Sequence, residues 1–364
     1  MRITLLGAGH IGQTIARLLD QTGDYEVTVV DRSPAALAKL EAGKMQLRVA
    51  ETSDPQTLLA VLRGQQAVVN ALPYHLATLA ATQALEAGCH YFDLTEDVAA
   101  TRAIKQLAEG ARTAFMPQCG LAPGFIGIVA HHLASSFDSV QEVKMRVGAL
   151  PAFPTNALKY NLTWSVDGLI NEYCHPCEAI RDGKNIDVLP LEGLEHFSLD
   201  GTEYEAFNTS GGLGTLCETW AGRVQRLDYK SVRYPGHRDL MKMLLEELQL
   251  NQDTETLKDI MRRAIPSTMQ DVVLVFVTVS GLRGGALVQE VFARKIFADR
   301  NESAPLSAIQ ITTAAGICAA VDLFREGRLP QRGFVRQEEV ELPAFLANRF
   351  GAAYQQSRQV ESIG

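Results

Sequence analysis

Short apolar stretches alternate with segments of helical periodicity through the first 120 residues of the chain. Residues 11–23 repeat apolar side chains at the spacing of one helical face, and two later helical segments end at glycine. The stretches that predict strands are residues 2–6, 25–31, 47–50, 67–72, 90–94 and 113–118. Repeated strand–helix units with short connections indicate a parallel sheet covered by helices on both faces. We therefore predict an α/β, Rossmann-type doubly wound domain over residues 1–120.

After Gly120 the pattern changes. Residues 142–148 alternate apolar and charged side chains, which predicts a strand with one solvent-facing side. Residues 271–297 predict two long strands around a glycine turn. We expect an α+β domain with a mixed sheet over residues 121–305, which would bind the substrate and form a dimer contact. The remaining residues, 306–364, are expected to form a helix and tail that pack back on the Rossmann domain.

Composition excludes several classes of protein. A chain of 364 residues favours two domains, and a formal net charge of -8 argues against a nucleic-acid or anionic-membrane binder. The longest apolar run, residues 272–277, is far shorter than the ~20 residues of a membrane helix. The N-terminal apolar stretch runs into glycines and has no cleavage signal. We expect a cytoplasmic protein.

The six cysteines give no framework for disulfides or metal. Cys174 and Cys177 form a C-x-x-C pair, but zinc would need a second pair of ligands at a suitable spacing. A redox pair would open a helix, whereas this pair follows a predicted helix over residues 167–173. We predict no metal site.

A glycine-rich loop follows the first predicted strand. Gly7, Gly9 and Gly12 fit G-x-G-x-x-G between a strand and a helix, which is the context that a dinucleotide site requires. The first glycine allows the tight turn, the second lets a pyrophosphate approach the backbone, and the third allows close helix packing. The helix N-terminus offers free N–H groups to the phosphates. The alternative is a glycine turn that binds another nucleotide or nothing.

Asp31, at the end of the second predicted strand, favours NAD because a carboxylate there binds the ribose hydroxyls and repels a 2'-phosphate. Arg32 follows directly and could hold that phosphate, so NADP stays open. Ligands of such sheets lie beyond the carboxyl ends of the strands. The predicted cofactor contacts are Gly7, Gly9, His10, Ile11, Gly12, Asp31, Arg32, Asp54, Asn70, Ala71, Leu72, Pro73, Leu121 and Pro123.

A second glycine-rich segment, residues 205–216, reads EAFNTSGGLGTL. It lacks the G-K-[ST] of a P-loop, and spacing alone is also consistent with a plain surface turn. However, the order of the motifs GAGHIG, VVNALPY, CGLAPG, YNLTWSVDGLINEY, EAFNTSGGLGTL and YKSVRYPGH resembles the saccharopine dehydrogenase family, most closely its L-lysine 6-dehydrogenase branch. The resemblance implies an NAD(P)-linked homodimer that acts on the amine of an amino acid and carries its substrate site in the second domain.

The sequence departs from this family in two places. Ala122 stands where saccharopine reductases usually have Asp, and Glu96 stands where many lysine dehydrogenases have a small residue. By resemblance, the second glycine loop lines the substrate pocket, with Thr209 and Ser210 offering hydroxyl groups. Tyr160 and Trp164 either pack on an aliphatic substrate or belong to the core.

Oxidation of an amine by hydride transfer requires a base for the amine proton and, for an amino acid, a cation for the carboxylate. Arg233 is the predicted carboxylate ligand, the alternative being a surface salt bridge. His237, Asp93 and Glu96 are the candidate bases. His237 could instead be structural, and Asp93 could cap the next helix.

Three hypotheses follow. The first is oxidative deamination of the ε-amine of L-lysine. The second is a secondary-amine substrate, saccharopine or carboxynorspermidine, whose further carboxylates would need more cations in the pocket. The cations available for this are Lys144, Arg146, Lys159, Arg181 and Arg226. The third is a non-catalytic dinucleotide-binding sensor.

Overall fold

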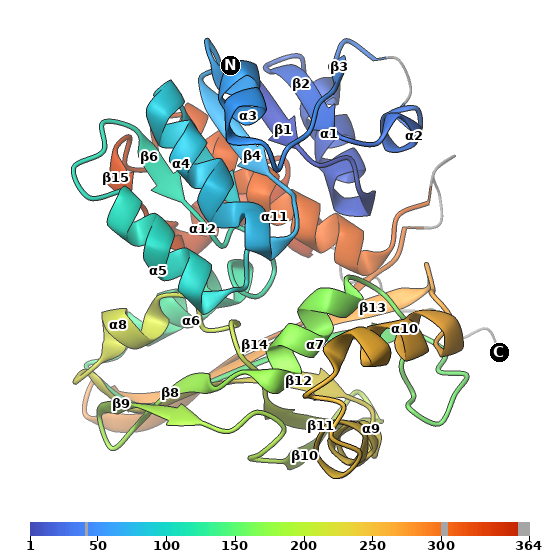
Figure 1. Ribbon diagram of the computed structural model, residues 1–364. Helices are drawn as coiled ribbons and strands as arrows, with labels where there is room; N and C mark the ends of the chain where they lie inside the picture. The colour runs from blue at the N-terminus through green and yellow to red at the C-terminus, as the bar shows by residue number, and fades with distance from the viewer. Residues whose placement is uncertain (41–42, 300–304, 356–364) are drawn as a thin grey trace, which may run out of the picture. The chain divides into compact units, whose positions relative to one another are not determined.

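The computed structural model describes residues 1–40, 43–299 and 305–355 (Figure 1). The described chain divides into two compact units, Met1–Ile128 with Gln310–Ala353, and Val129–Ile309 with Tyr354 and Gln355. The three-part division expected from the sequence stays a prediction.

A seven-stranded sheet forms the centre of the first unit, in the order β15-β6-β5-β4-β1-β2-β3 with parallel pairing throughout. Its strands are β1 (Arg2–Leu6), β2 (Glu26–Asp31), β3 (Gln46–Val49), β4 (Ala67–Asn70), β5 (His90–Asp93), β6 (Ala114–Met116) and β15 (Gly333–Phe334). The strand order reverses at β1, which is the point where such sheets bind dinucleotides. The predicted fold class is confirmed. Strand β15 was not predicted, because two residues are too few to show a periodic pattern.

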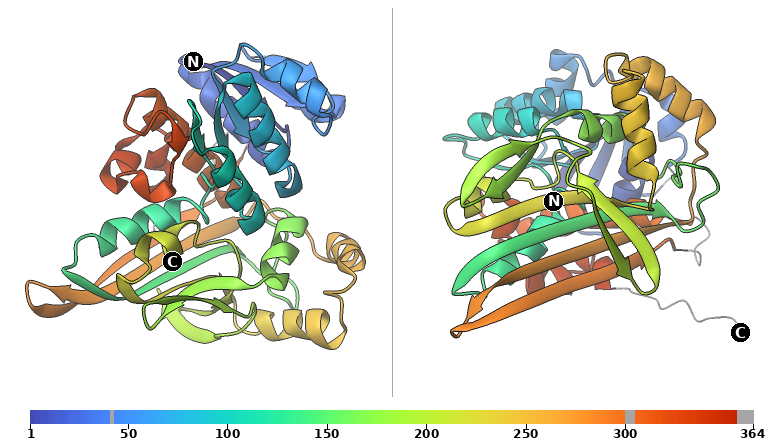
Figure 2. Two further views of the ribbon diagram at one scale, coloured as in Figure 1. Left: turned by 60° about the vertical axis from the view of Figure 1, so that its left-hand side comes forward. Right: turned by 90° about the horizontal axis from the view of Figure 1, so that it is seen from below.

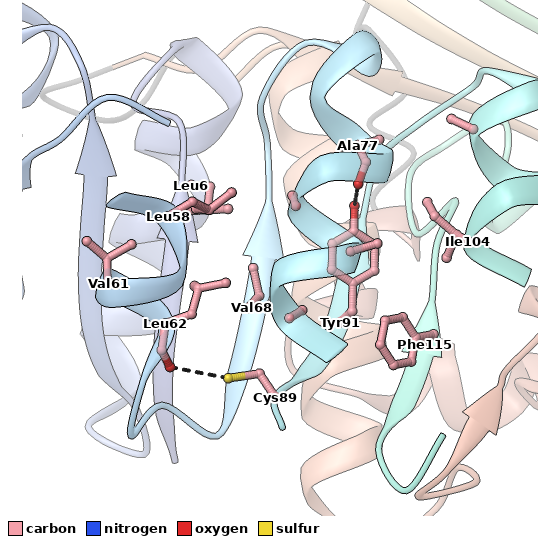
Figure 3. Packing of buried hydrophobic residues seen from close by; sticks show 14 of the residues in the cluster. Leu6, Leu58, Val61, Leu62, Val68, Ala77, Cys89, Tyr91, Ile104 and Phe115 are labelled. Atoms are coloured by element: carbon pink, nitrogen blue, oxygen red, sulfur yellow. Dashed lines mark hydrogen bonds between the residues drawn. The ribbon is translucent and has the colours of Figure 1, made fainter. Parts of the chain in front are cut away.

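Helices cover both faces of this sheet. The helical elements that lie mainly in this unit are α1 (His10–Thr22), α2 (Pro34–Leu37), α3 (Pro55–Leu62), η1 (Tyr74–Leu76), α4 (Ala77–Ala87), α5 (Val98–Leu107), α11 (Ala308–Arg325), η3 (Gln337–Glu339), α12 (Leu342–Ala347) and η4 (Gly351–Gln355). Helix α6 (Phe125–Ala134) begins in this unit and continues into the second. On one face α3, α4 and α5 bury apolar side chains such as Leu62 and Ile104 against Val68, Tyr91 and Phe115 of the strands (Figure 3). This burial is the main source of stability for the layer.

Local signals set the helix ends. The carboxylate of Asp54 accepts the backbone N–H of Thr57 at 2.7 Å and so caps α3, which begins with proline. Helix α4 ends at Gly88, whose φ of 70° is left-handed. Helix α11 is the one helix in the described part of the chain that is long and apolar enough to cross a membrane, and 83% of it is buried, as in a core helix.

The second unit is built on a mixed sheet of eight strands, in the order β10-β11-β12-β7-β13-β14, with β8 paired to β12 and β9 paired to β8. Its strands are β7 (Ser139–Pro151), β8 (Cys177–Arg181), β9 (Lys184–Val188), β10 (Glu195–Leu199), β11 (Thr202–Asn208), β12 (Val224–Arg233), β13 (Asp271–Arg283) and β14 (Ala286–Phe297). The helices are α7 (Val166–Cys174), α8 (Leu216–Trp220), α9 (His237–Lys242), the π-helical η2 (Met243–Glu247) and α10 (Thr254–Ala264). Strands β13 and β14 form the long hairpin that the sequence predicts (orange, Figure 2).

The charged side of β7 differs from the prediction. Val143, Met145 and Val147 are buried as expected, and Lys144 is half-exposed. Arg146, however, is only 2% exposed, because its guanidinium forms ion pairs with carboxylates of two other strands, Glu195 and Asp228. The prediction of a solvent-facing side chain was therefore wrong for Arg146. The alternation of side chains along one strand carries no signal for such long-range pairs.

Candidate active site

The first glycine loop leaves open space at the N-terminus of α1. A Cβ on Gly12 would lie 2.0 Å from the Gly7 carbonyl oxygen, and one on Gly7 would lie 2.8 Å from that of Ala71, so backbone packing requires both glycines. A Cβ on Gly9 would meet nothing within 4 Å. Gly9 is the exposed N-cap residue and supplies no side-chain cap, which leaves the first N–H groups of the helix available. This cradle fits a pyrophosphate.

Asp31 anchors the loop from the neighbouring strand. One carboxylate oxygen accepts the N–H of Ala8 at 2.7 Å, and the other accepts that of Ser33 at 2.7 Å. Each oxygen has a second lone pair, which suits the hydroxyls of an adenosine ribose. Arg32 is exposed beside it, as a partner for a 2'-phosphate would be. His10 and Ile11 form the first turn of α1, whereas Asp54 is the exposed cap of α3.

The end of β4 is held by side-chain hydrogen bonds. The Asn70 side-chain oxygen accepts the N–H of Leu72 at 3.1 Å, and its amide nitrogen donates to the Tyr91 hydroxyl at 3.0 Å. That hydroxyl lies 2.9 Å from Asp93 Oδ2 and 3.1 Å from the Ala77 carbonyl oxygen (Figure 3). The turn through Ala71, Leu72 and Pro73 is thereby fixed beside the first glycine loop.

The carboxylate of Asp93 is occupied by hydrogen bonds to neighbouring loops. It is 1% exposed, and its Oδ1 accepts the N–H groups of Thr95 at 3.0 Å and Gln118 at 2.9 Å, while Oδ2 faces Tyr91. Burial raises the pKa of Asp93 to about 6, although these three donors act in the opposite direction. The contacts give Asp93 the role of fixing the segment after β6, which continues to the buried Leu121 and Pro123.

Glu96 differs from Asp93 in its exposure and in its hydrogen bonds. It lies just past the end of β5 and is half-buried. Within the described residues, its carboxylate has neither an ion pair nor a hydrogen bond to another residue. Burial raises the pKa of Glu96 to about 7, and the charges of Asp97 and Asp93 act in the same direction. A carboxylate with this pKa can accept a proton near neutrality.

In the second unit, Arg233 ends β12 with only 3% of its surface exposed. Its Nε donates to the Tyr173 hydroxyl at 2.9 Å, its Nη1 donates to the Val232 carbonyl oxygen at 2.8 Å, and the guanidinium lies 5.2 Å from the centre of the Tyr160 ring. The buried carboxylate of Glu172 acts on it electrostatically, but no carboxylate of the described residues forms an ion pair with it, and its Nη2 has no acceptor among them. Buried charges in proteins are normally paired. Arg233 therefore has the environment of an anion-binding residue.

His237 is fully buried behind this guanidinium. Its Nδ1 lies 2.9 Å from the Leu158 carbonyl oxygen and its Nε2 lies 3.1 Å from the Tyr173 hydroxyl. Burial lowers the pKa of His237 to about 3, and the charge of Arg233 acts in the same direction. A neutral imidazole with both nitrogens engaged is a support for Tyr173, and this geometry argues against His237 as the base.

The second glycine loop packs on an aromatic ring. A Cβ on Gly212 would lie 2.3 Å from the ring of Tyr229, so the loop needs glycine there for close contact. The Thr209 and Ser231 hydroxyl oxygens are 2.8 Å apart, and the N–H of Ser210 donates to the Glu172 carbonyl oxygen at 3.0 Å. Thr209 and Ser210 are both buried beside the loop.

The motif YNLTWS supplies further groups. Tyr160 is buried, and half-buried Trp164 packs against the same apolar cluster. The Oδ1 atom of Asn161 is buried and has no hydrogen-bond partner among the described residues. Unsatisfied buried polar atoms are rare and call for an explanation such as a ligand. Sequence reasoning missed Asn161 and also Tyr173, since neither carries charge.

The C-x-x-C pair lies apart from these groups, at the end of α7 and the start of β8. Burial raises the pKa of the Cys177 thiol to about 12, which disfavours the reactive thiolate. In the described part of the chain, no group of three or more His, Cys, Asp or Glu residues could hold a metal ion.

Comparison with known families matches both units. Residues 3–116 match the saccharopine dehydrogenase NADP binding domain, and residues 120–348 match the saccharopine dehydrogenase C-terminal domain. The chain belongs to the saccharopine dehydrogenase family. This confirms the predicted family and its NAD(P) cofactor. Since the family is one of NAD(P)-dependent oxidoreductases, it also confirms the predicted class at that level.

Curated relatives include the mitochondrial alpha-aminoadipic semialdehyde synthases of Mus musculus, 23% identical over 199 residues, and Bos taurus, 22% identical over 224 residues. The matches cover 51% and 55% of this chain but only 21% and 24% of the relatives, so the chain spans about a quarter of their length or less.

Two solved structures share the fold. Saccharopine dehydrogenase (L-Glu forming) from Saccharomyces cerevisiae aligns with a TM-score of 0.78 at 16% identity, covering 94% of this chain and 96% of that one. Homospermidine synthase from Legionella pneumophila, in complex with NAD, aligns with a TM-score of 0.66 at 14% identity, covering 97% and 89%.

Proposed function

We propose that the protein oxidises the carbon–nitrogen bond of an amino acid with NAD(P)⁺, and that its specific substrate is the ε-amine of L-lysine. The observation that carries this proposal is Arg233, a buried guanidinium without a carboxylate partner among the described residues. A substrate α-carboxylate would supply the missing anion through charge-assisted hydrogen bonds.

The distribution of cations favours a substrate with one carboxylate. Successive side chains of a strand point to opposite faces of the sheet, so Arg226 lies on the face of β12 opposite Arg233. Lys144 and Arg146 pair in register with the residues of that opposite face, Asp228 and Lys230. Arg181 is exposed at the end of β8. Lys159 is also exposed, and its ammonium donates to the Pro235 carbonyl oxygen at 2.9 Å. None of the five joins Arg233 among Tyr160 and Tyr173, whereas saccharopine would require several cations there.

The residues have distinct roles in the proposed reaction. Bound at the first glycine loop and Asp31, NAD(P)⁺ would accept a hydride from the carbon that bears the amine. Glu96 takes the proton that the substrate ammonium loses, and its pKa of about 7 makes this transfer less costly than for an ordinary carboxylate. The substrate imine then adds water and releases ammonia, which leaves an aldehyde. The lysine-derived aldehyde would cyclise to a piperideine carboxylate.

Two findings support an amino-acid aldehyde as product. The curated relatives are named semialdehyde synthases, and the yeast structure with the same fold is a saccharopine dehydrogenase. The same two findings also support the second candidate, a secondary-amine substrate such as saccharopine or carboxynorspermidine. The third candidate, a dinucleotide sensor without turnover, gives no reason for the buried polar groups of the second unit.

The test is NAD(P)H formation by the purified protein at alkaline pH with L-lysine, ornithine, saccharopine or carboxynorspermidine, each with NAD⁺ and with NADP⁺. Reduction with L-lysine and an equal yield of ammonia is expected. Reduction with saccharopine or carboxynorspermidine alone would move the function to a secondary amine. If no amine gives NAD(P)H although the protein still binds NADH, the sensor hypothesis is supported and the dehydrogenase hypotheses are refuted.

We also propose a cytoplasmic homodimer, on the resemblance to the family. Light scattering on the purified protein, with a mass of twice 39.7 kDa expected, checks the dimer.

A further inference from the structure

We propose that Tyr173 is a positioning residue, which orients the Arg233 guanidinium for a substrate carboxylate, and that His237 sets the direction of the Tyr173 hydroxyl. This inference rests on the proposed function, since it concerns how the same site recognises its substrate. Four groups form one chain of hydrogen bonds, from the Leu158 carbonyl through His237 and Tyr173 to Arg233.

The position of every proton in this chain follows from its two ends. The Leu158 carbonyl can only accept, so His237 Nδ1 carries a hydrogen and Nε2 carries none. Nε2 therefore accepts, and the Tyr173 hydroxyl must donate to it across 3.1 Å. Since its only hydrogen is used, the Tyr173 oxygen accepts from Arg233 Nε at 2.9 Å. A guanidinium nitrogen can only donate, so the chain is consistent from end to end.

The chain is buried among aromatic rings, and the buried carboxylate of Glu172 acts on Arg233 from outside it. Tyr173 and His237 are 1% and 0% exposed, and the ring of Phe207 packs on both, at 5.7 Å and 6.3 Å between ring centres. Burial keeps the imidazole neutral, so Arg233 is the one charged member of the chain. With Nε and Nη1 tied to protein oxygens, the guanidinium cannot rotate about its axis. Its Nη2 edge is then held in one orientation for a substrate carboxylate, which would lower the entropy cost of binding.

The Tyr173→Phe variant tests the role of the hydroxyl. It removes one oxygen and keeps the ring, so Arg233 Nε loses its acceptor and the guanidinium gains freedom. We expect kcat/KM for L-lysine to fall by about tenfold or more, mainly through KM. Cadaverine, the same diamine without a carboxylate, is the matched substrate. Its kcat/KM should change by no more than about twofold, because no group of cadaverine contacts Arg233.

A pair of His237 variants tests the second link. His237→Gln offers an amide oxygen that can still accept from the Tyr173 hydroxyl, whereas His237→Leu offers no acceptor. We expect the Leu variant to lose discrimination between L-lysine and cadaverine, and the Gln variant to retain most of it. Thermal unfolding and the dissociation constant for NADH show whether each variant is folded.

Equal losses with L-lysine and cadaverine in Tyr173→Phe, or no loss with either, would overturn the inference. If the wild-type protein turns over neither amine, the proposed function fails by itself, and calorimetric titration of L-lysine then decides the inference. If the wild-type protein oxidises L-lysine but not cadaverine, the same titration also tests the inference. At least about tenfold weaker binding of L-lysine to Tyr173→Phe supports the positioning role. Equal binding, or no binding to the wild type, would refute it.

Discussion

Replacing Glu96 by Gln should make the protein more stable and less active at the same time. The side chain keeps its shape and loses its charge. In the folded protein the pKa of Glu96 is raised from 4.5 to about 7, so the folded state holds the proton more tightly than the unfolded state. For an acid with a raised pKa, stability is lost as pH rises from about 4.5 to about 7 and then stays constant.

The magnitude follows from this shift. At 1.36 kcal/mol per pKa unit, the full shift corresponds to about 3.4 kcal/mol, and solvent screening of a half-buried carboxylate reduces it to about 1–2 kcal/mol. Glu96→Gln should gain this amount of unfolding free energy at about pH 8 and nothing at about pH 4.5. Because a positioned base contributes about 10²–10⁴-fold, kcat/KM for the amine should fall by a similar factor.

Two assays check the prediction. Urea unfolding at both pH values measures the stability difference, and the exposed Glu109 provides the control variant Glu109→Gln, which should change neither quantity. The pH profile of kcat/KM should show an acid limb with an apparent pKa near 7 in the wild type and lose it in Glu96→Gln. If stability is unchanged at both pH values and the acid limb persists, Glu96 is neither strained nor the base.

Three further variants probe buried and closely packed groups of the two units. Asp322 is 1% exposed, and although burial alone raises its pKa, hydrogen bonds from Arg349, Tyr25 and other residues lower the pKa overall. Because Arg325 and Arg349 form ion pairs with this carboxylate, Asp322→Asn should cost about 3–5 kcal/mol at neutral pH in urea unfolding, and the difference should shrink below about pH 4; a difference independent of pH would refute this ionic account. Gly212→Ala forces the Tyr229 ring to move and should cost about 1–3 kcal/mol in the same assay; an unchanged midpoint would show that the ring yields freely. Asn161→Leu removes a buried acceptor without a partner, so it should raise the melting temperature while raising the KM for L-lysine; if the melting temperature falls, Asn161 is satisfied in solution.

The sequence predicted the first unit well because its signals are local. Apolar runs and helical periods lie within single elements, and Gly12 of the first loop meets the backbone of Gly7 only five residues away. Asp31 is placed by the strand that it ends. The two-residue strand β15 was not predicted, because its pairing with β6 depends on residues more than 200 positions earlier.

The second unit could be predicted only in outline. Its long hairpin was visible, and the family motifs directed attention to Arg233. The partners of Arg233 could not be found, because Tyr173 resembles any aromatic residue on an amphipathic helix. Likewise, nothing in the sequence separates Asp93, whose oxygens are occupied, from Glu96, whose carboxylate has no other residue to bind within the described chain. That difference depends on where the surrounding loops place their N–H groups.

The most direct test of the account compares two arginines of the same strand in steady-state oxidation of L-lysine. Arg233 faces the tyrosine cluster with 3% of its surface exposed, whereas the side chain of Arg226 is 69% exposed. We predict that Arg233→Leu lowers kcat/KM for L-lysine by about 100-fold or more, with NADH binding unchanged, and that Arg226→Leu changes it by less than about twofold. Full activity in Arg233→Leu, or equal losses in both variants, would contradict the assignment of Arg233 to the substrate carboxylate.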